Sequence, residues 1–211
     1  VRLPRCTTHV EGAGCDAKQD VAAWRGEDIV AVGIVGYVQN QRIPIIAIRR
    51  RVCVRGFVKI NAIVVGEGKP SDYAIRTNMH ALARYSALCQ EQGLVPIVEP
   101  EVFMDGSHSI DDCRSATTRS LISVFEELDA QNVDLEGIVL KPNMVISGAD
   151  APNRASAAEV ARQTIDCFLE TVPTNVPGIA FLSGGQGDEE SVVNLNEISK
   201  IASTEDLPWE L

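Results

Sequence analysis

A chain of 211 residues, 45% of them hydrophobic, can bury one substantial core, and its mean hydropathy near zero excludes an integral membrane protein. The formal net charge of −10 at pH 7 repels polyanions, which argues against nucleic acid or an anionic bilayer as partner, although a local basic pocket could still bind a small phosphorylated substrate. The chain has no long apolar run and no apolar stretch typical of a secretory signal near residue 1, so we expect a cytoplasmic protein.

The strands and helices expected in chain order alternate. Apolar runs predict strands at 52–60, 93–101, 136–143 and 177–185. Apolar residues at helical spacing predict surface helices at 72–93, 109–132 and 154–173, and Gly93 is placed to end the first of them. Such alternation predicts right-handed βαβ units and a parallel sheet, either doubly wound or closed into a (β/α)8 barrel.

Polar residues at the ends of the strands favour the barrel. Lys59, Glu99, Lys141 and Ser183 follow one another at intervals of 40, 42 and 42 residues, each at the carboxyl end of a strand. In a barrel these ends converge on one mouth, where active sites form. We therefore expect the four side chains to share a site.

Lys141 is unusual because it follows the apolar residues 138–140 and precedes a proline. A lysine there could simply cover apolar surface with its stem and keep its ammonium in water. A second cation and partial burial would instead favour the neutral amine, which condenses with a carbonyl to form an iminium. Glu99 could then move protons, and the segment SGGQG at 183–187 could offer backbone N–H groups to a phosphate or be an ordinary turn.

The six cysteines (Cys6, Cys15, Cys53, Cys89, Cys113 and Cys167) are scattered and lack C-x2-C spacing, so we expect reduced thiols. Cys6, His9 and Cys15 lack an evident fourth partner, and no metal site is expected. His80 falls in a predicted helix and His108 in a polar loop. We expect both to be solvated or hydrogen-bonded, and neither is given a role.

At these strand ends the sequence resembles the class I fructose-bisphosphate aldolases, which act through a Schiff base. The matching stretches are ALARYSALCQEQGLVPIVEPEV, LEGIVLKPNMVISG and VPGIAFLSGGQGDEESVVNLNEI. The resemblance implies an α/β fold of the TIM (β/α)8 barrel family, with strands 4–7 as its recognisable part. It covers residues 57–211 and leaves 1–56 as an atypical, unassigned segment.

The resemblance also implies an activity, namely the reversible cleavage of fructose 1,6-bisphosphate into glyceraldehyde 3-phosphate and dihydroxyacetone phosphate. Lys141 matches the Schiff-base lysine, Glu99 the general acid/base, and Glu101 an acidic residue close to that chemistry. Lys59 matches a lysine that assists the Schiff-base amine. Ser183, Gly184 and Gly185 match a loop that holds a substrate phosphate. A metal-free, cofactor-free enzyme, tetrameric like many relatives, is expected.

The sequence also departs from the family pattern. Ile60 and Asn61 replace the tryptophan and arginine that usually follow the lysine, and residues 1–56 lack the polar groups of the family's first strands. The family's eighth strand would follow the last residues, LPWEL. These departures leave open a catalytically inactive relative or an interaction module. A different Schiff-base barrel enzyme, such as a transaldolase, explains Lys141 but not the order of the motifs.

Overall fold

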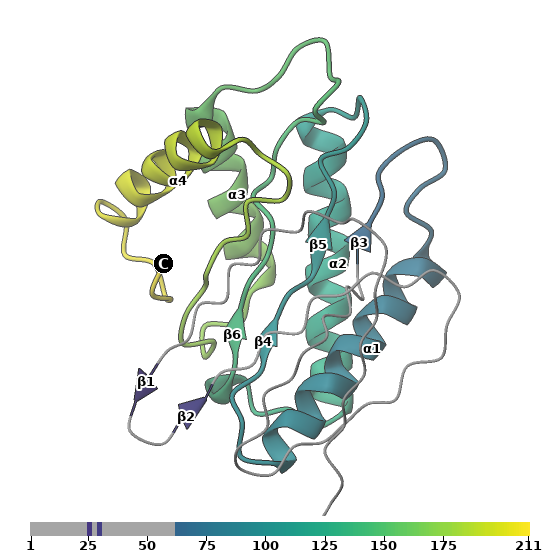
Figure 1. Ribbon diagram of the computed structural model, residues 1–211, viewed down its shortest axis with the longest axis vertical. Coiled ribbons are helices and arrows are strands. Elements are labelled where there is room, and N and C mark those ends of the chain that lie inside the picture. The colour runs from purple at the N-terminus through teal and green to yellow at the C-terminus, as the bar shows by residue number, and fades with distance from the viewer. Residues whose placement is uncertain (1–24, 27–28, 31–61) are drawn as a thin grey trace, which may run out of the picture.

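The computed structural model describes residues 25–26, 29–30 and 62–211 (Figure 1). Its strands are β1 (Arg25–Gly26), β2 (Ile29–Val30), β3 (Ala62–Ile63), β4 (Ile97–Val98), β5 (Glu101–Val102) and β6 (Val139–Leu140). Its helices are α1 (Asp72–Glu91), α2 (Ile110–Ala130), the 3-10 helix η1 (Leu135–Gly137), α3 (Ala157–Thr171) and α4 (Asp188–Ala202). The three predicted helices are confirmed, whereas the predicted strand at 52–60 lies outside the described residues.

Serine caps mark the starts of α1, α2 and α3, whereas Gly187 before α4 makes no side-chain cap bond. The hydroxyls of Ser71, Ser109 and Ser156 accept backbone N–H groups at the starts of α1, α2 and α3. In α2, Asp112 also accepts from the backbone of Ser109, which completes a capping box. After α1, Gly93 has φ +69°, a left-handed conformation that glycine adopts at low cost. Capping therefore fixes the helix boundaries locally, before tertiary packing.

The parallel sheet follows the order of the chain. β3 pairs with β5, β4 pairs with β6, and single parallel bridges join Leu140 to Ile179 and Gly178 to Glu210. Each extended segment thus lies beside the next one along the chain. The helices follow the same order, with α1 packed on α2, α2 on α3 and α3 on α4 (Figure 1). A doubly wound sheet would reverse its strand order, so this sequential arrangement is that of a barrel wall.

Prolines keep the regular strands short. Pro100 separates β4 from β5 and Pro142 follows β6, and neither has an N–H group for the ladder. Hydrogen bonds nevertheless continue the pairing of the segment at 139–142 with both of its neighbours. The N–H of Lys141 donates to the carbonyl of Val98 at 2.7 Å, and the N–H of Leu182 donates to the carbonyl of Pro142 at 3.3 Å. The chain is therefore held in register up to the predicted site residues.

The core lies between the sheet and the helices. Val98 and Leu140 are fully buried and face a layer that includes Val124 on α2 and Phe168 on α3. Phe168 also stacks on Phe181, with ring centroids 5.9 Å apart. Burial of such side chains contributes roughly 1.5–3 kcal/mol each, so this layer stabilises the wall that carries the strand ends.

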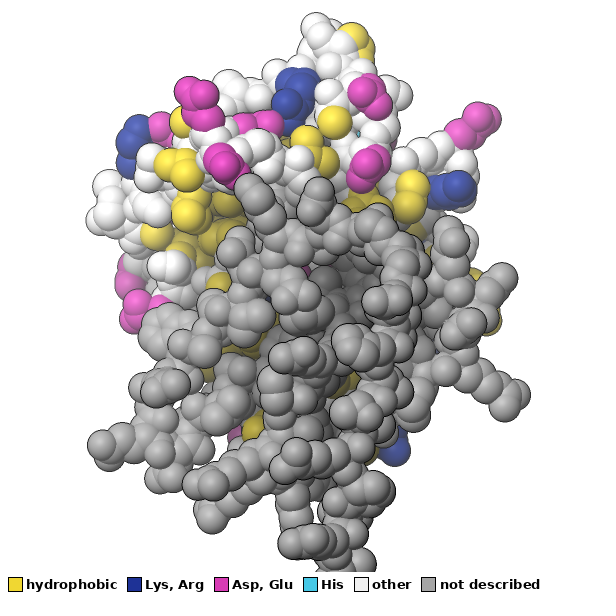
Figure 2. All heavy atoms as spheres, in the orientation of Figure 1, with side chains coloured by type: hydrophobic (Ala, Val, Ile, Leu, Met, Phe, Trp, Pro, Cys, Tyr) yellow, Lys and Arg dark blue, Asp and Glu magenta, His cyan; other side chains and the backbone are white. Residues whose placement is uncertain are grey.

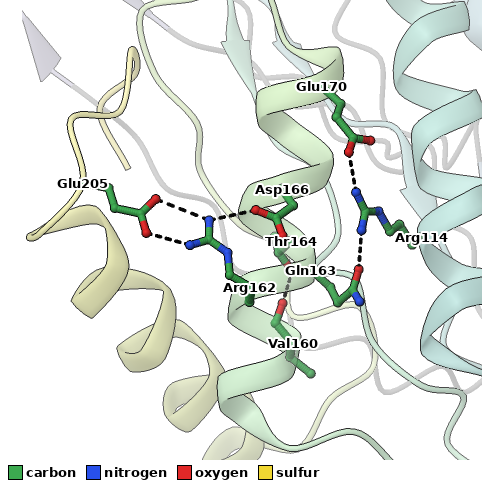
Figure 3. Close-up of polar contacts among 8 residues, drawn as sticks. All are labelled: Arg114, Val160, Arg162, Gln163, Thr164, Asp166, Glu170 and Glu205. Carbon is green, nitrogen blue, oxygen red and sulfur yellow. Dashed lines mark hydrogen bonds and ion pairs between the residues drawn. The ribbon is translucent and has the colours of Figure 1, made fainter.

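Ion pairs join the outer helices (Figure 3). Arg114 on α2 donates to Gln163 at 2.7 Å and to Glu170 at 2.6 Å, both on α3. Arg162 on α3 donates to Glu205, just beyond α4, at 2.6 Å. These groups are partly exposed, so each pair adds little stability but favours one register between neighbouring helices.

The last residues continue the sheet. Glu210 forms the parallel bridge with Gly178, and the indole N–H of the buried Trp209 donates to the carbonyl of Pro173 at 3.0 Å. The sheet thus continues into LPWEL, a feature that the apolar pattern did not predict.

The outer face of α4 carries exposed apolar side chains. Val192, Val193 and Leu195 are each at least 41% exposed, and Figure 2 shows apolar and acidic side chains mixed on this part of the surface. In the part of the chain that the structure describes, no helix has the length and apolarity to cross a bilayer.

Candidate active site

The central pair of the candidate site is Lys141 with Glu99. Val98 and Leu140 are in register, so the next residues, Glu99 and Lys141, lie side by side at the carboxyl ends of adjacent strands. The Lys141 Nζ to Glu99 Oε1 distance is 3.3 Å, and the two side chains are 31% and 17% exposed. The lysine is therefore neither a free surface cation nor an unpaired buried one. The contact lets a carboxylate exchange protons with an amine, directly or through water.

Glu101 lies two residues beyond Glu99 and is 6% exposed. It is in β5, in register with Ala62 of β3. The structure thus brings Glu101 to the same edge of the sheet as Glu99 and Lys141. Lys59, the fourth predicted catalytic residue, lies outside the described residues.

The predicted phosphate loop lies at the same edge. The bond from the Leu182 N–H to Pro142 places Ser183 just beyond the end of the neighbouring strand. Gly184 and Gly185 have φ +64° and +92°, which side-chain-bearing residues rarely adopt. A Cβ at Gly185 would also lie 3.3 Å from the sulfur of Met104. The loop conformation therefore requires its glycines.

Asn143, which the sequence analysis did not single out, joins the strand ends behind the site. Its side-chain oxygen accepts the N–H of Val102 at 3.0 Å, and its amide nitrogen donates to the hydroxyl of Thr117 on α2 at 3.1 Å. The buried carboxamide thus replaces a ladder bond where Pro142 interrupts the strand. A polar residue directly after a strand-ending proline was the only signal in the sequence.

Gln186 and Asn194 also lie behind the phosphate loop and were not predicted. Both are buried, and the Asn194 amide nitrogen donates to the Gln186 Oε1 atom at 2.7 Å. Gln186 lies near the end of the loop, and Asn194 lies on α4, eight residues farther along the chain. The SGGQG segment marked the loop but gave no sign that its glutamine points inward.

Two of the loops at this edge pack backbone against backbone. The N–H groups of Gly148 and Asp150 donate to the carbonyls of His108 and Gly106, each at 2.9 Å. A Cβ on Gly148 would lie 2.3 Å from the Gly106 oxygen, closer than any real contact. The loop after β5 and the segment after Lys141 are therefore locked together.

His108 is buried, which corrects the expectation of a solvated ring. Its exposed fraction is 7%, and neither ring nitrogen has a hydrogen-bond partner in the described part of the chain. Burial lowers the pKa of His108, although the nearby carboxylates of Asp112 and Asp105 act in the opposite direction. The neutral ring is the form that the folded protein favours.

His108 is expected to make the fold less stable in mild acid. Because folding lowers its pKa, the unfolded chain takes up the proton first, so the free energy of unfolding should fall as pH drops below the unfolded value of about 6.5. His108→Phe, compared with the parent by urea unfolding from pH 7.5 to 5.5, should show a flatter dependence. Equal slopes for the two proteins would contradict this assignment.

The three described cysteines, Cys89, Cys113 and Cys167, are free and buried. Burial raises the pKa of all three thiols, that of Cys167 to about 11, so they remain protonated at neutral pH. Among residues 25–26, 29–30 and 62–211, no group of three or more histidine, cysteine, aspartate or glutamate side chains could hold a metal ion.

Comparisons with known proteins give the family. The family model described as "Glycolytic: Fructose-bisphosphate aldolase class-I" matches residues 54–211. A "Probable fructose-bisphosphate aldolase class 1" from Xanthomonas axonopodis pv. citri is 54% identical over 156 residues, which is 74% of this chain and 46% of that protein. "Fructose-bisphosphate aldolase 4, cytosolic" from Arabidopsis thaliana is 45% identical over 156 residues, or 74% of this chain and 39% of that protein.

A solved structure of fructose-bisphosphate aldolase from Plasmodium falciparum, in complex with TRAP and a small-molecule inhibitor, superposes with a TM-score of 0.67 at 43% identity. The match covers 70% of this chain and 42% of that one. The chain thus spans less than half the length of these relatives. The α/β fold is that of a TIM-barrel protein, and the chain belongs to the class I fructose-bisphosphate aldolase family.

Proposed function

We propose that the protein catalyses the reversible aldol cleavage of fructose 1,6-bisphosphate to glyceraldehyde 3-phosphate and dihydroxyacetone phosphate. The observation that carries the proposal is the contact of Lys141 with Glu99 at adjacent strand ends, 3.3 Å apart. An amine beside a carboxylate, with both side chains mostly shielded from water, suits imine chemistry on a ketone. The names of the relatives supply the substrate class.

In the proposed reaction the neutral amine of Lys141 attacks the ketone carbon of the open-chain sugar. Glu99 gives a proton to the departing hydroxyl of the carbinolamine, and water leaves as the iminium forms. The carboxylate that Glu99 now carries takes the proton of the C4 hydroxyl, the C3–C4 bond breaks, and the electrons of that bond pass into the iminium to give an enamine. Glyceraldehyde 3-phosphate leaves first. Protonation of the enamine and hydrolysis of the imine release dihydroxyacetone phosphate and restore Lys141.

The remaining predicted residues take supporting roles. Glu101 adds a second carboxylate at the same edge, and Lys59 would assist the Schiff-base amine and contact the substrate. Ser183, Gly184 and Gly185 would bind a substrate phosphate through the hydroxyl and backbone N–H groups. We propose that no metal or organic cofactor takes part, so a chelator should not alter the rate.

We also propose an assignment of the wider architecture. Residues 57–211 would form strands 4–7 of the barrel with their helices, and residues 1–56 a separate, atypical segment. The sequential order of the parallel segments supports consecutive barrel strands, and the numbering 4–7 rests on the resemblance alone. We propose a cytoplasmic location, since one relative is named cytosolic. We also propose a homotetramer, which only the resemblance to the family implies.

The test is to trap the imine. Borohydride added with fructose 1,6-bisphosphate should reduce the iminium to a stable amine on Lys141, which peptide mass spectrometry would locate. Lys200, which is exposed and paired with Glu197 far along α4, serves as the internal control and should stay unmodified. An unmodified Lys141 would favour the alternative, a catalytically inactive member of the family.

A further inference from the structure

The phosphate loop is closed by a side chain as well as by its backbone. The backbone N–H of Gln186 donates to the carbonyl of Ser183 at 3.2 Å, and the Gln186 amide nitrogen donates to the same oxygen at 2.8 Å. The same amide group approaches the sulfur of Met144 at 3.7 Å. With its oxygen bound to Asn194, the carboxamide of Gln186 is satisfied on both its donor and its acceptor side.

These contacts determine how the loop presents its next N–H group. The Ser183 carbonyl and the Gly184 N–H belong to one planar peptide unit, which is trans, so the two groups point in opposite directions. Two donors hold the carbonyl toward the buried Gln186. The Gly184 N–H must then point the other way, toward the side of the loop where the exposed Ser183 side chain lies.

We propose that Gln186, oriented by Asn194, is the positioning residue of the phosphate loop. It fixes the Ser183–Gly184 peptide plane so that the Gly184 N–H and the Ser183 hydroxyl address the same phosphate group. The glycines at 184 and 185 make the loop conformation possible. Because they lack side chains, they also leave the peptide planes of the loop free to rotate. The carboxamide removes that freedom before the ligand arrives. This inference rests on the proposed function of the loop.

The test measures phosphate binding at the loop itself, in the full-length protein. With isotope labelling at glycine, the Gly184 and Gly185 N–H signals are followed by NMR while inorganic phosphate is added. Gln186→Met keeps the length of the side chain but removes its hydrogen bonds. It should raise the Kd for phosphate about tenfold, the effect of one lost charge-assisted hydrogen bond. Asn194→Asp keeps Gln186 but removes the amide group that donates to the Gln186 oxygen. It should therefore also raise the Kd for phosphate.

Gln163→Met is the matched control, since it removes a glutamine contact to Arg114 on the outer helices. It should leave the Kd for phosphate unchanged. In steady-state cleavage, Gln186→Met should raise KM for the phosphorylated substrate more than it lowers kcat. A merely structural role would lower the melting temperature without changing phosphate affinity.

The outcomes separate this inference from the proposed function. If borohydride traps Lys141 but folded Gln186→Met and Asn194→Asp bind phosphate as the parent does, the positioning role is overturned and the aldolase proposal stands. If Lys141 is not trapped but both variants lose phosphate affinity, the positioning role stands and the aldolase proposal fails.

Discussion

Replacing Lys141 with arginine is expected to lower kcat/KM for aldol cleavage on the order of 10⁴-fold or more, the scale seen when a covalent nucleophile is removed. Arginine keeps a positive charge beside Glu99 and can retain the ion pair, so the fold should survive the change. Its guanidinium stays protonated and cannot form an imine with the sugar ketone. The rate should fall because the proposed covalent route is lost, since the positive charge at the strand end is preserved.

The measurement is steady-state cleavage of fructose 1,6-bisphosphate by both proteins, with circular dichroism to confirm equal folding. Lys200→Arg, on the exposed face of α4, is the matched control and should retain the parent rate. A Lys141→Arg protein that cleaves at more than about a tenth of the parent rate would rule out imine formation at this position as the main path.

Gly148→Ala is expected to destabilise the fold by about 3–5 kcal/mol, near the upper end of single-substitution effects. The added Cβ would lie 2.3 Å from the Gly106 oxygen and 2.9 Å from the His108 nitrogen. Both atoms belong to backbone, which cannot move aside by changing a rotamer. The two loops would have to separate. The hydrogen bonds from the N–H groups of Gly148 and Asp150 to the carbonyls of His108 and Gly106 would then be lost.

Urea unfolding of parent and variant measures this effect. Gly66→Ala is the control, because a Cβ at Gly66 meets nothing within 4 Å, and its stability should stay within about 0.5 kcal/mol of the parent. If Gly148→Ala unfolds at the parent's urea concentration, the close packing of the two loops is not as described. Partial loss of aldol cleavage is expected as well, since the loops follow the strands that carry Glu101 and Lys141.

Local signals in the sequence predicted α1, α2 and α3 and the central pair, but not α4. Apolar periodicity predicted these three helices, and the serine caps found at the starts of α1, α2 and α3 act within a few residues of the chain. The meeting of Glu99 with Lys141 followed from one rule, that the carboxyl ends of neighbouring parallel strands share an edge. Their contact required only that the two strands be adjacent and in register.

The buried amides and the buried histidine could not be predicted in this way. The Asn143 side chain accepts the backbone N–H of Val102, 41 residues away in the chain. This contact depends on how the two strands are aligned where proline interrupts one of them. His108 stands in a polar stretch that predicts exposure, yet its side chain is buried and its backbone carbonyl accepts the N–H of Gly148. Such contacts are set by how two loops pack, and sequence spacing carries no information on that packing.

The proline beside Lys141 also affects how its loop could change. Pro142 has no N–H group to continue the ladder directly after Lys141, so a residue inserted farther along that loop is not expected to shift the register of the strand. Loop length at this edge could therefore vary while the amine and carboxylate keep their spacing. That insulation would let substrate range diverge without rebuilding the reactive centre.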